Sequence, residues 1–137
     1  MALKVPNASE LFILDLLVVE LFDNAVLHLY QNNITPADGD TLATYTEATF
    51  SGYAEITLDA WSAAFTDAGN KARVEEEARE FLHNGGAVNN SIYGYYITNV
   101  GSTQLLWAER NPAAPVVINA GNPSYTVLPR FTLNSEF

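Results

Sequence analysis

The sequence contains no cysteine and few basic residues, and each absence excludes several classes of protein. Without cysteine the chain cannot form disulfide bonds, a thiolate nucleophile or a zinc site held by thiolates. Six lysines and arginines stand against 16 aspartates and glutamates, so the formal net charge is −10 at pH 7. Such a surface repels phosphate backbones and anionic lipids. We therefore expect neither nucleic acid nor membrane as a partner.

Signatures of catalysis are missing as well. The sequence has no nucleophile elbow, no paired-histidine zinc motif and no phosphate-binding glycine loop. His28 and His83 lie on expected strands with no second histidine or cysteine nearby, so we predict structural roles for both. The stretch Asp38-Gly39-Asp40 offers oxygens that calcium prefers, but a surface turn is the simpler interpretation. We expect no catalytic residue, no cofactor and no metal, and the protein is predicted not to be an enzyme.

The longest apolar run, Leu11 to Phe22, is too short to span a bilayer and is interrupted by two acids. No small-residue cleavage site follows it, so we expect no signal peptide and a protein that acts where it is made. Asn7 or Ser9 is available as an N-cap, which predicts a helix of about three turns. The helix either packs into the core or forms a docking arm against a neighbouring subunit.

Apolar residues make up 48% of the chain, which predicts a folded domain with a substantial core. Two runs of aromatic and apolar residues between Ser91 and Arg110 flank a polar linker, Asn99 to Thr103, which is typical of a β-hairpin. Gly94 within the first run suggests a bulge or a bulky neighbour. Alternation along this run predicts two faces: Ile92 and Tyr96 on one, and Tyr93, Tyr95 and Ile97 on the other.

Further strands are expected at Ala25–Gln31 and at Ser124–Leu133, where Pro129 indicates an edge position or a bulge. Lys71–His83 has strong helix propensity, although a strand would suit its place before the hairpin. The predicted fold is a single mainly β domain over residues 1–137. We expect an antiparallel β-sandwich or barrel-like arrangement, with a short N-terminal helix and arm in residues 1–23.

Three parts of the chain together resemble a known class of protein. They are Leu3-Lys-Val-Pro-Asn7 with the apolar helix after it, Leu27 to Pro36 leading to Tyr45–Tyr53, and Ile92-Tyr-Gly-Tyr-Tyr96 with Leu105–Arg110 and Val127–Leu133. This pattern resembles small structural proteins of tailed bacteriophages that decorate or cement the capsid shell. In proteins of this kind the stretch before the Gly-Tyr-Tyr hairpin is a strand, so we predict a strand at Arg79–His83, preceded by a possible helical turn.

The resemblance implies a non-enzymatic virion protein on the capsid exterior, made and assembled in the bacterial cytoplasm. Its partners would be the major capsid protein and further copies of itself, most simply as a trimer. The alternative is a tail or head fibre module in which the aromatic hairpin binds a host-surface glycan. The residues predicted to contact partners are apolar ones of the N-terminal segment and two tyrosines of the hairpin: Leu3, Val5, Leu11, Phe12, Leu14, Tyr93 and Tyr95.

Overall fold

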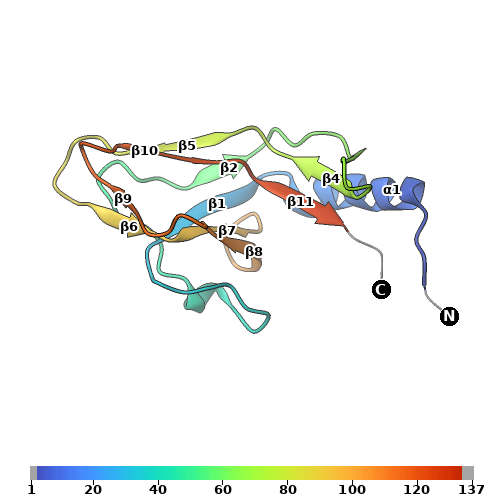
Figure 1. Cartoon of the computed structure of the whole chain (residues 1–137), viewed down its shortest axis with the longest axis horizontal. Coiled ribbons are helices and arrows are strands. Elements are labelled where there is room, and N and C mark those ends of the chain that lie inside the picture. Colours follow the sequence, from blue (N-terminus) through green and yellow to red (C-terminus); the bar gives the residue numbers. More distant parts are fainter. Residues whose placement is uncertain (1–2, 134–137) are drawn as a thin grey trace.

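The structure, a computed structural model, describes residues 3–133 and confirms a mainly β fold with antiparallel sheets and an N-terminal helix (Figure 1). Helix α1 spans Asn7–Leu17 and continues into a π-helical turn, η1, at Val18–Phe22. A 3-10 turn, η2, covers Leu42–Thr44. The strands are β1 Ala25–Tyr30, β2 Ile56–Leu58, β3 Phe65–Thr66, β4 Ala72–Glu75, β5 Arg79–Leu82, β6 Asn90–Ile92, β7 Gly94–Thr98, β8 Leu105–Arg110, β9 Val116–Ile118, β10 Ser124–Val127 and β11 Arg130–Leu133.

The central sheet has four antiparallel strands in the order β2-β1-β7-β8. Every residue of β1 and β7 is buried, as expected for strands covered on both faces. Strands β7 and β8 form the predicted hairpin. In its turn, the Asn99 side-chain oxygen accepts hydrogen bonds from the backbone N–H groups of Thr103 and Gln104, both at 2.9 Å. These bonds fix the turn and so the register of the hairpin.

A long two-stranded ribbon runs over this sheet. Strand β4 pairs with β11, and β5 with β10. At the break between the two pairs, the Glu76 N–H donates to the Pro129 carbonyl at 2.9 Å, so the ladder continues. The expectation of one strand at Ser124–Leu133 was wrong in detail. Pro129 cannot donate a ladder hydrogen bond, and the chain divides there into two strands of different sheets.

The strand predicted from Arg79 is confirmed as β5, but the helical turn expected before it is wrong. Residues 72–75 form strand β4, in which Ala72 and Val74 are buried and alternate with Arg73 and Glu75. Pairing with β11 and burial of this alternating face outweigh a helix preference of a few tenths of a kcal/mol per residue.

Two apolar clusters hold the fold together. The larger lies between the central sheet and the β5–β10 part of the ribbon, with Leu27, Leu29 and Ile97 on one side and Phe81 and Val127 on the other. Figure 1 shows β5 and β10 running above the strands of the central sheet. This arrangement is that of a sandwich.

The smaller cluster packs α1 and η1 against β4, with Leu14, Phe22, Ala72 and Val74 at its centre. The Phe22 ring lies 5.0 Å from Trp107 and 5.5 Å from Trp61, measured between ring centroids. Trp61 and Trp107 also pack against the larger cluster, so the two cores are continuous.

The predicted faces of the hairpin need a correction at its start. Ile92 belongs to β6, which pairs with β9, and it packs with Tyr95 and Ile97 rather than opposite them. Tyr93 packs instead beside Tyr96. The cause is the interruption between β6 and β7, which breaks the two-residue alternation.

The start of α1 also differs from the prediction. Neither Asn7 nor Ser9 is the N-cap; Pro6 occupies that position in an extended conformation. Its carbonyl accepts hydrogen bonds from the N–H groups of Ser9 and Glu10. Proline suits this place because its missing N–H would find no intrahelical partner.

Gly94 is predicted to tolerate no side chain. A Cβ there would overlap the Glu109 carbonyl and lie 2.8 Å from the Tyr30 ring, and both are held in the buried sheet. Gly94→Ala should therefore lower the free energy of unfolding by about 1–3 kcal/mol, measured as a lower urea midpoint. Gly39→Ala, where nothing lies within 4 Å of the new Cβ, is the control. Equal midpoints for the two variants would contradict this account of Gly94.

Candidate functional site

The helical segment α1–η1 carries apolar residues on both of its sides. One side packs on the smaller core through Leu14 and Phe22. The other presents Phe12, Leu16 and Val19 to solvent, with exposed fractions of 71%, 52% and 71%. Their spacing of four and three residues places these side chains on one stripe of the helix. A soluble protein usually exposes such residues singly. A contiguous apolar stripe is a candidate for contact with another molecule.

The helix is fixed in place, so this stripe has a defined geometry. The Asp15 carboxylate accepts a hydrogen bond from the Ala64 N–H at 2.8 Å, and Asn7 donates to Asn70 at 3.1 Å. Strand β4 lies directly against α1. The stripe is thus preorganised, and a partner would not have to order it on binding.

The predicted contact residues of the N-terminal segment separate into two groups. Leu3 and Phe12 are exposed, and Val5 and Leu11 are half-buried. Leu14 has no exposed surface and belongs to the smaller core, so its side chain cannot reach a partner. Leu16 and Val19 were not in the predicted set. The sequence places Leu16 and Val19 in an apolar helix but does not show which side of it faces outward, because that depends on the packing against β4.

The two hairpin tyrosines lie elsewhere, on the central sheet. Tyr95 is buried, and its hydroxyl donates to the Glu109 carboxylate at 2.7 Å. Burial, reinforced by this carboxylate, raises the pKa of Tyr95 well above its usual range. Tyr93 is half-buried with the Arg110 guanidinium 5.3 Å from its ring centroid. Tyr95 therefore has no open face of the kind that stacks on a sugar, and Arg110 covers one face of the Tyr93 ring.

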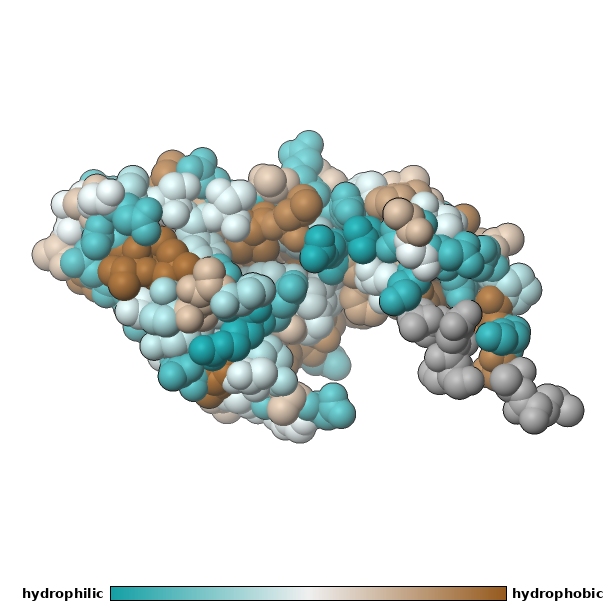
Figure 2. Space-filling model, viewed as in Figure 1, coloured by the Kyte–Doolittle hydropathy of each residue, from teal (hydrophilic) through white to brown (hydrophobic). Residues whose placement is uncertain are grey.

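A second apolar area lies at the end of the molecule away from α1. Figure 2 shows it over β6 and β9. Val117 of β9 is about half exposed, as is Val88 just before β6. These residues lie on short strands and a loop, and they form no helical stripe.

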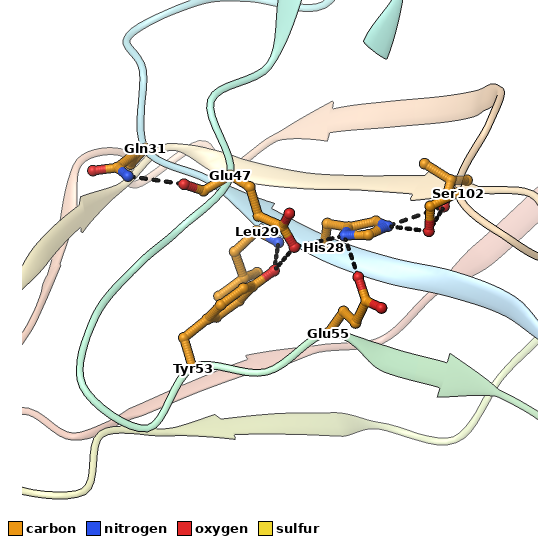
Figure 3. A network of polar contacts seen from close by, with 8 residues as sticks. His28, Leu29, Gln31, Glu47, Tyr53, Glu55 and Ser102 are labelled. Carbon is orange, nitrogen blue, oxygen red and sulfur yellow. Dashed lines mark hydrogen bonds and ion pairs between the residues drawn. The ribbon is translucent and has the colours of Figure 1, made fainter. Parts of the chain in front are cut away.

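A polar network surrounds His28 in the middle of the apolar strand β1 (Figure 3). The imidazole is 3% exposed. Its Nδ1 lies 2.8 Å from Glu47 Oε1 and 3.4 Å from Glu55 Oε2. On the other side, Nε2 lies 2.9 Å from the Thr98 hydroxyl oxygen. The Tyr96 ring stacks on the imidazole with 4.6 Å between centroids.

This network forms at a change of strand partner. The first half of β1, Ala25–Leu27, pairs with β2. At the end of β1, Tyr30 pairs instead with Glu47, which lies in the chain between β1 and β2. Tyr53 fills the gap between these partners, and its hydroxyl accepts the Leu29 N–H and donates to the Glu47 carboxylate. Burial raises the pKa of Tyr53 far above its ordinary value, so the hydroxyl keeps its proton. Glu47 and Glu55 consequently approach His28 from the two sides of one gap.

The sequence did not predict this grouping. His28 has no histidine or cysteine near it in the chain, and the two glutamates are ordinary surface acids by pattern. His83, by contrast, is held by the Val88 carbonyl, the Asn89 side chain and the Gly85 N–H, and no carboxylate among residues 3–133 contacts its ring. Asp40 closes a turn by accepting hydrogen bonds from the Ala37 N–H and the Tyr45 hydroxyl, as the turn interpretation predicted.

Comparison with known proteins gives no family for the chain. No family model matches it, and no curated protein or solved structure is significantly similar to it. Within residues 3–133, no helix has the length and apolar character needed to cross a membrane. Function must therefore be argued from the surface and the network described above.

The side chains on the inward side of α1 are predicted to contribute to the free energy of unfolding. Leu14→Ala should lower the free energy of unfolding by about 2–5 kcal/mol, because it opens a cavity in the smaller core. The matched control is Leu82→Ala on β5, where the side chain is about half exposed and the loss should stay within about 0.5 kcal/mol. Urea unfolding measures both. A loss for Leu14→Ala no larger than the control would mean that α1 is not anchored through this residue.

Proposed function

We propose that this protein is a non-enzymatic structural subunit of a tailed-phage virion that binds the capsid exterior and stabilises the shell. The observation that carries the proposal is the exposed stripe of Phe12, Leu16 and Val19 on a helix that is already anchored. A rigid apolar stripe suits permanent assembly rather than catalysis. The resemblance of the chain to decoration and cement proteins points the same way.

The occupant of the stripe is the same stripe on further copies of this chain, most simply in a trimer. Phe12, Leu16 and Val19 are uncharged and lie at the spacing of a helical packing seam. Over the rest of their surfaces, two copies with a net charge of −10 each would repel one another. In a cyclic trimer, equivalent stripes from the three copies can meet around the three-fold axis. Covering each large apolar side chain contributes about 1.5–3 kcal/mol.

Stabilisation of the shell then follows from binding alone. A subunit that contacts two or more shell proteins favours the assembled state by its binding free energy. Joining three such subunits multiplies the effect, because the second and third contacts become intramolecular. The acidic surface keeps a crowded capsid exterior soluble.

The alternative, a fibre module that binds a glycan, has one observation in its favour. A hollow of about 210 Å³ beside the hairpin is lined by Tyr95, Glu109, Asn111, Tyr125 and Arg130, among others. Sugar rings stack on exposed aromatic faces, whereas Tyr95 and Tyr125 are buried with their hydroxyls bonded to Glu109 and Asn111. The helix stripe therefore favours the assembly function.

The oligomer is tested by light scattering on the purified full-length protein. We expect a mass three times that of the 15.0 kDa chain, and a monomer for the double variant Phe12→Ser, Val19→Ser. Val100→Ser, which changes an exposed valine in the hairpin turn, should remain trimeric. Point substitutions are preferable to removing residues 1–22, since the deletion also takes Leu14 and Phe22 from the core. A wild-type protein that is monomeric at its highest soluble concentration would contradict the trimer.

The capsid function is tested by cosedimentation with purified shells of the phage whose genome encodes the chain, prepared without this protein. Binding should saturate at a fixed ratio to the shell protein and should raise the temperature at which the shells dissociate. The Phe12→Ser, Val19→Ser variant should bind at least tenfold more weakly, because it loses the avidity of the oligomer. If the wild-type protein stays in the supernatant, it is not a capsid subunit.

A further inference from the structure

The contacts of His28 leave its Nδ1 atom in an unusual electrostatic position. Two carboxylates, Glu47 and Glu55, face this one nitrogen at 2.8 and 3.4 Å. Nδ1 can carry a proton and donate it to Glu47; if Nδ1 carries a lone pair instead, the two carboxylates facing it require a positive charge between them. The three atoms lie within 4.8 Å of one another, so one small cation can touch all of them.

We propose that His28, Glu47 and Glu55 form a binding site for a divalent transition cation of the zinc type. Imidazole nitrogen and carboxylate oxygen are both ligands of such ions. Metal–ligand bonds of about 2.0–2.2 Å in a tetrahedral arrangement separate neighbouring ligand atoms by about 3.3–3.5 Å. The Nδ1–Glu55 distance already has this value, and Glu47 needs to withdraw by only about half an ångström.

The groups behind these ligands support the site. A histidine that binds a metal through one nitrogen donates the N–H of the other to an acceptor. Here the buried Thr98 hydroxyl lies 2.9 Å from Nε2 and donates its own proton to Ser102, so its oxygen can accept the Nε2–H of the tautomer in which Nδ1 is available to a metal. The Tyr53 hydroxyl, 3.0 Å from Glu47 Oε1, orients that carboxylate in the same way. Figure 3 shows both glutamates directed at the same edge of the His28 ring.

The site is open on one side. His28 is buried, whereas the side chains of Glu47 and Glu55 are 41% and 56% exposed. A cation can therefore enter from solvent and complete its coordination with water. Because Glu47 and Glu55 lie on opposite sides of the turn at Ser51 and Gly52, the cation would fasten this turn to β1.

Isothermal titration of the full-length protein with Zn²⁺ alone, in a buffer free of chelators, tests the site. We expect one ion per chain and a higher Tm in its presence, since the ion binds the folded arrangement. Glu55→Gln should weaken binding at least about tenfold without harming the fold, because Glu55 is exposed. Thr98→Val, which removes the acceptor at Nε2, should weaken it by about 10–100-fold.

Two control variants distinguish this site from adventitious binding by an acidic protein. Glu77→Gln removes an exposed carboxylate elsewhere, and His83→Gln removes the other histidine. Both should bind Zn²⁺ as the wild type does. The visible spectrum of bound Co²⁺ should change in His28→Gln and not in His83→Gln. The proposal is overturned if Zn²⁺ does not bind, or if Glu77→Gln weakens binding as much as Glu55→Gln. None of these variants touches the helix stripe, so the outcome is independent of the assembly function.

Discussion

The pairing of β1 with β7 is the interaction on which the rest of this structure depends. Both strands are buried along their whole length, so each face of the pair needs a cover. The β5–β10 ribbon covers one face and forms the larger core. On the opposite face, Tyr30 and Tyr96 pack with Tyr45 from the long connection after β1. Burial of a polar residue in such a pair requires partners, which explains why the groups around His28 are so closely organised.

The helical segment faces a different constraint, because a helix with apolar residues on two sides needs a cover on both of them. Its inner side meets β4 and the aromatic cluster of Phe22, Trp61 and Trp107. Its outer side finds no cover within residues 3–133. The sequence presents a core helix and a docking arm as alternatives, and the structure gives this one element both a packed side and an exposed apolar side.

The sequence pattern was sufficient to predict an element wherever a single physical effect determines its structure. The hairpin turn at Asn99, the buried strand β1 and the helix before it follow from local propensity and apolar content. Prediction failed where tertiary pairing overrides propensity, as at residues 72–75, and where one residue interrupts an alternation, as at Tyr93. The grouping of His28 with Glu47 and Glu55 had no local signal. It depends on a strand that changes partners, and the chain reveals this only when folded.

The ribbon of β4 and β5 with β10 and β11 also sets an order on folding. Residues 72–82 are made about fifty positions before residues 124–133, their only ladder partners apart from the short β3 among the described residues. Until β10 and β11 leave the ribosome, one edge of this segment remains unpaired, and Val74 and Phe81 lack part of their cover. Pairing across such a separation is slow, because loop closure precedes any gain from contact. Completion of the sandwich is thus a late event in folding, and the newly made chain passes through a stage with exposed strand edges.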